Sequence, residues 1–135
     1  MKKTLIILIS LALTITLFAG CFGRGGHSLN IDASEVSRID GRIAPSVSQV
    51  TDIAEIEAIV NRLNTYRMVP PWGDMNIGGE TPEIDLSIYG KQEWRIQIWG
   101  GGYIRFTDPN GTRHGMYRII DGGNVVWEFW EEFGN

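Results

Sequence analysis

Residues 84–107 read IDLSIYGKQEWRIQIWGGGYIRFT, and this stretch decides the fold because apolar and polar residues alternate along it. Alternation with a period of two puts apolar side chains on one face of a β-strand and polar side chains on the other. The alternating runs are separated by Gly90-Lys91 and by Gly100-Gly101-Gly102, which are typical of tight turns. A further alternating run at 116–120 follows the turn sequence Asp108-Pro109-Asn110-Gly111. The pattern predicts a four-stranded antiparallel meander.

An amphipathic helix is predicted before the meander, at residues 52–67. Thr51 or Asp52 can cap its first amides, and Glu55 stands where a capping box from Asp52 requires it. Pro70-Pro71 prevents its continuation. The residues expected on its buried stripe recur at three- and four-residue spacing: Ile53, Ile56, Ile59, Val60, Leu63 and Tyr66. Residues 68–82, which are rich in proline and glycine, are expected to form a long irregular loop.

The C-terminal residues 124–133 do not alternate and instead fit a short helix. Its apolar arc on a helical wheel consists of Val125, Val126, Phe129, Trp130 and Phe133. Residues 35–43 and 46–50, before the central helix, have a strand-like composition. The whole pattern predicts an α+β fold: a four-stranded antiparallel meander plus one or two N-terminal strands, with the central helix and the short C-terminal helix packed on one face.

The N-terminal residues have the layout of a secretory leader. Two lysines precede an apolar stretch at 5–18, which is shorter than the roughly 20 residues that a membrane-spanning helix needs. The run Phe18-Ala19-Gly20-Cys21 resembles the bacterial lipobox, although leucine is more usual where Phe18 stands. The resemblance implies cleavage before Cys21 and diacylglycerol on its thiol, which supplies the two acyl chains that stable anchoring requires. An uncleaved anchor and a buried helix are the alternatives.

The chain therefore divides into three parts. A signal peptide is expected at 1–20, the lipidated Cys21 with a flexible glycine-rich tether at 21–28, and a single α+β domain at 29–135. The expected location is the extracytoplasmic side of the cell membrane, with lipid on Cys21 as the contact.

The predicted domain also resembles a group of known proteins. Its central helix opens with Thr51-Asp52-x-x-Glu55-Ile56 and closes with Leu63-Asn64. With the order of elements, these residues resemble small lipoprotein domains of Gram-positive bacteria that have no assigned function. The resemblance spans residues 31–133, and it implies no catalytic residue.

Charge and cysteine content exclude several functions. Without the two leader lysines the chain has 10 basic and 16 acidic residues, a net charge of −6. A net-acidic module binds nucleic acid and anionic membrane surfaces poorly, so no nucleic-acid partner is expected. Because Cys21 is the only cysteine, an internal disulfide and a Cys-x-x-Cys metal site are both excluded.

Candidate catalytic and metal-binding residues are few. His114 is the only histidine in the predicted domain, and no serine lies in a nucleophile-elbow context, so His114 is expected to be a plain strand-end residue. Residues 74–80 place oxygen ligands at alternate positions but lack the distant bidentate glutamate of a calcium loop. Glu128, Glu131 and Glu132 are expected to form a solvated helix face. No catalytic residue, metal site or cofactor is therefore predicted.

The strand face directed away from the core is the candidate binding surface. It combines aromatic rings with guanidinium groups in an otherwise acidic protein: Tyr89, Arg95, Trp99, Tyr103, Arg105 and Arg118, with Gln97 among them. Aromatic rings offer stacking platforms, and arginine binds carboxylate or phosphate through two parallel hydrogen bonds. We hypothesise a cell-wall glycan, an acidic polymer or an acidic envelope protein as the partner. The alternative is a sheet face whose cross-strand pairs serve stability alone.

These features favour a membrane-anchored extracytoplasmic lipoprotein that acts as a non-enzymatic binding or interaction module. Two alternatives stay open. A small cell-envelope enzyme requires a cleft with converging titratable groups near His114 or the loop at 74–83. An accessory subunit of a membrane complex requires an exposed docking stripe on the C-terminal helix, with Val126, Phe129 and Phe133 open to solvent.

Overall fold

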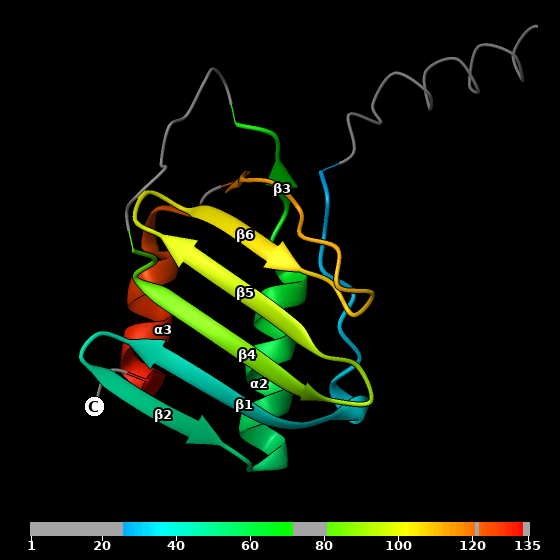
Figure 1. Cartoon of the computed structure of the whole chain (residues 1–135). Coiled ribbons are helices and arrows are strands. Elements are labelled where there is room, and N and C mark those ends of the chain that lie inside the picture. The colour runs from blue at the N-terminus through cyan, green and yellow to red at the C-terminus, as the bar shows by residue number, and fades with distance from the viewer. Residues whose placement is uncertain (1–25, 72–80, 121, 134–135) are drawn as a thin grey trace, which may run out of the picture.

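One seven-stranded antiparallel sheet forms the centre of the computed structural model, which describes residues 26–71, 81–120 and 122–133 (Figure 1). The strands are β1 (Val36–Ile43), β2 (Ser46–Val50), β3 (Met68–Val69), β4 (Ile84–Gly90), β5 (Trp94–Trp99), β6 (Tyr103–Thr107) and β7 (Tyr117–Ile119). They lie in the order β2-β1-β4-β5-β6-β7-β3. Strands β4 to β7 confirm the predicted meander, and β1 and β2 confirm the N-terminal strands.

Two helices, α2 (Ile53–Thr65) and α3 (Val125–Phe133), lie on the same side of the sheet, which confirms the predicted α+β arrangement (Figure 1). The side of the sheet in contact with these helices is called the helix-covered face. Its strand residues are buried: Ile39, Ile43, Ile84, Leu86, Ile88, Ile96, Ile98, Ile104, Phe106 and Ile119. Removal of these apolar side chains from water is the main stabilising contribution to the fold.

Strand β3 was not expected, because residues 68–82 were predicted to form an irregular loop. Met68 pairs with Ile119 and Val69 with Arg118, and Met68 is fully buried. A two-residue strand is too short to produce an alternation in the sequence, so only its pairing with β7 identifies it. The prediction is therefore wrong at 68–69, and residues 72–80 lie outside the described part of the chain.

Helix α2 begins as its capping sequence predicts. Asp52 is the N-cap, and its Oδ1 accepts a 3.1 Å hydrogen bond from the amide of Glu55. The buried stripe contains Ile56, Ile59, Val60 and Leu63, and Tyr66 is buried just beyond the helix. Ile53 was placed on this stripe wrongly, since it is 73% exposed. It stands both at the edge of the apolar arc and at the end of the helix.

Helix α3 follows a short 3-10 turn, η2 (Gly122–Asn124), and buries Val125, Phe129 and Phe133. Trp130 was placed on the buried arc wrongly, since it is 41% exposed. Consecutive helical residues are separated by about 100° around the axis. Trp130 therefore points well away from Phe129, which is at the centre of the buried arc.

Gly41, in the middle of β1, lets α3 approach the sheet closely. It lies between Ile39 and Ile43 on the helix-covered face, and a methyl group at this position would overlap the ring of Phe133. Phe133 is fully buried, and its carbonyl accepts a 3.4 Å hydrogen bond from Ser48 Oγ in β2. The last turn of α3 thus depends on the missing side chain at residue 41.

Part of the segment that was predicted to be a flexible tether contacts the sheet. His27 forms a β-bridge with Met68, with N···O distances of 2.7 and 2.8 Å, and its ring lies 5.0 Å from that of Tyr117. Leu29 and Ile31 are buried, and the side chain of Asn64 bonds both the amide and the carbonyl of Ile31. Residues 26–28, which were predicted to belong to a flexible tether at 21–28, are therefore attached to the sheet.

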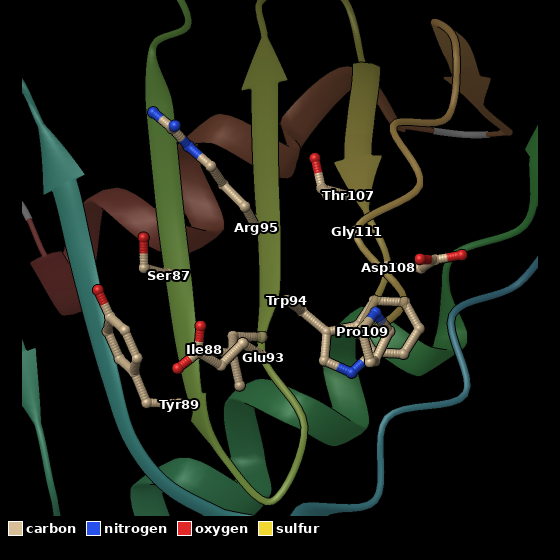
Figure 2. A pocket seen from close by; sticks show the side chains of 10 residues that line it. All are labelled: Ser87, Ile88, Tyr89, Glu93, Trp94, Arg95, Thr107, Asp108, Pro109 and Gly111. Carbon is tan, nitrogen blue, oxygen red and sulfur yellow. The ribbon is translucent and has the colours of Figure 1, made fainter.

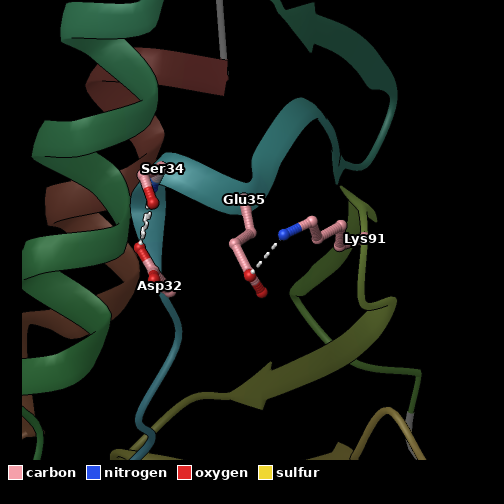
Figure 3. A network of polar contacts seen from close by, with 4 residues as sticks. All are labelled: Asp32, Ser34, Glu35 and Lys91. Atoms are coloured by element: carbon pink, nitrogen blue, oxygen red, sulfur yellow. Dashed lines mark hydrogen bonds and ion pairs between the residues drawn. The ribbon is translucent and has the colours of Figure 1, made fainter.

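A polar network joins the chain before β1 to the hairpin between β4 and β5 (Figure 3). Asp32 caps the short 3-10 helix η1 (Ala33–Glu35) and accepts hydrogen bonds from the amide and the hydroxyl of Ser34 at 3.0 and 2.7 Å. These bonds lower the pKa of Asp32. Lys91 in the hairpin forms a 3.2 Å ion pair with Glu35, and its amide donates to the Glu35 carbonyl.

Candidate functional site

The side of the sheet opposite α2 and α3 is polar, and we call it the open face. Its residues alternate with the buried ones, and the strand register arranges them in rows. One row is Arg42, Asp85, Gln97 and Arg105, and the next is Asp40, Ser87, Arg95 and Thr107. Arg38 pairs with Tyr89 at one end of the face, and Trp99, Tyr103 and Arg118 form a row at the other.

The open face and the two helices carry opposite charge. The rows above contain five arginines and two aspartates, whereas the sequences of α2 and α3 contain five glutamates and one arginine. Although the chain as a whole is acidic, these rows therefore form a locally basic surface. Such a surface attracts anions over about one Debye length, ~8 Å at physiological salt.

An ion pair between Arg95 and Asp85 lies at the centre of the open face. Arg95 Nε donates to Asp85 Oδ1 at 3.1 Å and Nη2 donates to Oδ2 at 2.7 Å, so the pair is bidentate. The hydrogen bond to Asp85, with the charge of that carboxylate, raises the pKa of Arg95. Asp85 therefore compensates much of the charge that Arg95 would offer to a ligand.

Two aromatic rings of the open face are covered by arginines. The Arg38 guanidinium lies 4.2 Å from the centroid of the Tyr89 ring, and that of Arg105 lies 5.3 Å from the Trp99 ring. Arg38 Nε is buried 3.0 Å from Asp40 Oδ1, without the alignment of a hydrogen bond. Trp99 is only 5% exposed, so its ring offers no stacking platform to a ligand.

A shallow cavity of about 280 Å³ lies at the hairpin end of the open face (Figure 2). Figure 2 shows the Arg95 side chain reaching over β4, with Trp94 and Pro109 at the opposite side of the cavity. Glu93 and Asp108 also line it. The cavity therefore combines one guanidinium with two carboxylates, and it is not selective for anions.

A second cavity of about 250 Å³ lies at the other end of β4, and Arg95 lines it too. Arg42, Thr81 and Gln97 contribute the other hydrogen-bond donors, and Asp85 is the carboxylate at its wall. Among the described residues, Arg42 has no ion-pair or hydrogen-bond partner for its guanidinium, and it is exposed. Of the two cavities, this one is better suited to a carboxylate or a phosphate.

All six predicted binding residues lie together on the open face. Their availability to a ligand differs. Arg118 is exposed, whereas Arg105 and Tyr103 are half-buried and Arg105 lies over Trp99. Arg95 is paired with Asp85, Tyr89 is covered by Arg38, and Trp99 is buried. Arg42 and Arg38 also lie on this face but were not among the predicted residues. Both alternate with the buried Ile39 and Ile43 in β1, and extending the period-two analysis from the meander to that strand identifies them.

His114 has a structural role that the sequence did not reveal. Its Nε2 lies 2.9 Å from Asp108 Oδ2, and its ring stacks on Phe106 with a centroid distance of 4.4 Å. Asp108 Oδ1 accepts hydrogen bonds from the amides of Asn110 and Thr112, which shape the turn after β6. Among the described serines none bonds to His114, so no Ser-His-Asp arrangement is formed.

The described ranges also bear on the expectations about metal binding, membrane spanning and docking. Within 26–71, 81–120 and 122–133, no group of three His, Cys, Asp or Glu residues is placed to hold a metal ion. In the same ranges no helix combines the length and the hydropathy needed to cross a bilayer. Cys21 and the acidic loop at 74–80 lie outside these ranges. Phe129 and Phe133 are fully buried, so the docking stripe that the accessory-subunit alternative requires is not exposed.

Comparison of the chain with known protein-family models, curated proteins and solved structures finds no match.

Proposed function

We propose that this protein is an extracytoplasmic lipoprotein, held at the membrane by lipid on Cys21, and that its open face binds an anionic polymer of the cell envelope. The observation that supports binding is the position of Arg42. Its guanidinium has no partner within the described part of the chain, and it lines the 250 Å³ cavity together with Arg95 and Gln97, on the positively charged face of an acidic protein. A guanidinium forms paired hydrogen bonds with carboxylate and phosphate groups, which are the groups that such polymers carry.

The cavity also fits this class of ligand geometrically. An open, strand-based surface follows an extended chain better than a closed pocket does, and Arg105 and Arg118 continue the positive charge away from the cavity. The Arg95–Asp85 pair would hold the centre of the surface rigid. Lipid attachment would keep this surface close to envelope polymers, which raises their effective concentration.

The binding proposal is tested with the full chain in detergent and two probes, a polyphosphate and a poly-L-glutamate chain. We expect binding that weakens between 50 and 200 mM salt, because exposed charges are screened. Arg42→Gln should raise the Kd about two- to fivefold, and Arg42→Lys should raise it less. The control is Lys91→Gln, which removes the same charge in the hairpin at the far end of β4. Equal effects of the two glutamine variants would mean that net charge alone is responsible, and would contradict the proposal.

The anchoring proposal is tested separately by cell fractionation. Cys21→Ser removes the thiol that carries the lipid, so we expect the protein to move from the membrane fraction to the soluble fraction. A variant that stays membrane-bound would refute the lipid anchor while leaving the binding proposal untouched.

A further inference from the structure

Two exposed tryptophans on α3 form a site that the proposed function does not use. Trp127 is 70% exposed and Trp130 is 41% exposed, although both are large apolar side chains. Their ring centroids are 6.4 Å apart, and the ring planes are tilted by 57°. The pair therefore presents two aromatic faces at an angle, which form a corner and not a flat platform.

A carboxylate lies in the same hollow. Trp127, Trp130 and Val126 line a cavity of about 270 Å³ together with Glu83, Gly100 and Gly101. A Cβ atom at Gly100 would lie 2.5 Å from Glu83 Oε1, so the carboxylate rests where residue 100 has no side chain. Among the described residues Glu83 has no ion-pair or hydrogen-bond partner, and its charge is available to a ligand.

The two tryptophan rings and Glu83 together favour a positively charged ligand. Angled aromatic faces attract cations through their ring quadrupoles, and Glu83 adds a full negative charge. Glu128 and Glu131 on the same helix add further negative potential, which disfavours anions. Drug-sized ligands need cavities of about 300–1,000 Å³, so this one suits a small head group.

We propose that the cavity between α3 and the β5–β6 turn binds a small organic ammonium cation, with a quaternary ammonium head group as the preferred form. The two tryptophan rings contact the methyl groups, and Glu83 balances the charge. This site is independent of the open face, since it has the opposite charge and none of its lining residues is shared with the two cavities there.

The test is ligand-detected NMR titration of the full chain in detergent with choline. The matched control ligand is 3,3-dimethylbutan-1-ol, which has the same shape but no charge. We expect choline to bind and the neutral analogue to bind roughly three- to tenfold more weakly. Trp127→Ala, Trp130→Ala and Glu83→Gln should each weaken choline binding, whereas Ile53→Ala, which removes an equally exposed apolar residue from α2, should not.

Two further ligands make the result decisive. Phosphatidylcholine vesicles, offered to the same variants, distinguish a lipid head group from a free amine as the source of the cation. N-acetylglucosamine represents a neutral sugar, which could also stack on tryptophan. Equal binding of choline and its neutral analogue, tighter binding of the sugar, or no loss in the tryptophan variants would overturn the proposal. Circular dichroism of each variant confirms that the fold is kept, as expected for exposed residues.

Discussion

The two faces of the sheet are formed by alternate residues of the same strands, yet we expect them to tolerate different substitutions. On the helix-covered face most alternate residues of the central strands β1, β4, β5 and β6 are buried, and all of these but Gly41 are apolar. On the open face the side chains contact one another across neighbouring strands, in exposed ion pairs and cation–π contacts. Buried packing contributes to stability in proportion to area, whereas exposed ion pairs contribute little. We therefore expect stability to depend on one face and binding on the other.

The largest expected effect comes from truncating a side chain of the core that lies between the helices and the helix-covered face. Phe129→Ala removes a fully buried ring from α3, and we expect it to lower the free energy of unfolding by about 3–5 kcal/mol. Trp127→Ala, two residues earlier on the exposed side of the same helix, should change it by no more than about 0.5 kcal/mol. Urea unfolding monitored by circular dichroism measures both. Similar losses of unfolding free energy in the two variants would show that the exposed side of α3 stabilises the fold as much as the buried side, and would contradict the prediction.

A smaller effect is expected at Gly41, where the helix-covered face has no side chain. Gly41→Ala would place a methyl group against the ring of Phe133, so we expect a loss of about 1–3 kcal/mol from overpacking. The matched control is Gly115→Ala, whose added methyl meets no atom within 4 Å. That variant should be neutral or slightly stabilising, because alanine restricts the unfolded chain.

The comparison at Gly41 is checked by a second variant. Phe133→Leu frees space at the ring position, so it should reduce the cost of Gly41→Ala in a double-mutant cycle. If Gly41→Ala is as mild as Gly115→Ala, then α3 does not depend on close approach to β1.

Much of the fold follows from local patterns in the sequence. The meander is predicted because each strand alternates over several residues, and α2 because Asp52 caps a regular apolar stripe. Strand β3 is missed because two residues carry no period, and its identity depends on pairing with the distant β7. Ile53 and Trp130 were predicted to be buried, but both are exposed. A helical wheel gives the direction of a side chain and not how far the neighbouring layer covers it, and both residues stand at the edges of their apolar arcs.

The candidate site is less predictable than the fold. Alternation correctly places Tyr89, Arg95 and Trp99 on one face, since parity in a strand is a local property. It does not tell which cross-strand neighbours pair: Asp85 binds Arg95, and Arg105 covers Trp99. Those pairings depend on register and on rotamers, which no single strand encodes.

The smallest expected effect concerns the turn at the edge of the open face, and it depends on pH. The hydrogen bond with His114, followed by those from the amides of Thr112 and Asn110, lowers the pKa of Asp108. The unfolded chain has a pKa near 3.9 for this residue type, so the folded state favours the carboxylate. Its contribution to stability is therefore present above about pH 4 and is lost as the pH falls through the lower, folded value.

Asp108→Asn removes this contribution, and the wild type should lose more stability than the variant between about pH 5 and pH 2. Urea midpoints measured across that range give the comparison, and His114→Gln should reproduce part of the change because it removes the first cause of the lowered pKa. The curves of wild type and Asp108→Asn should converge at low pH, where both side chains are neutral. Parallel curves would mean that the turn gains nothing from the charge of Asp108, and that its carboxylate serves there only as a hydrogen-bond acceptor for the backbone.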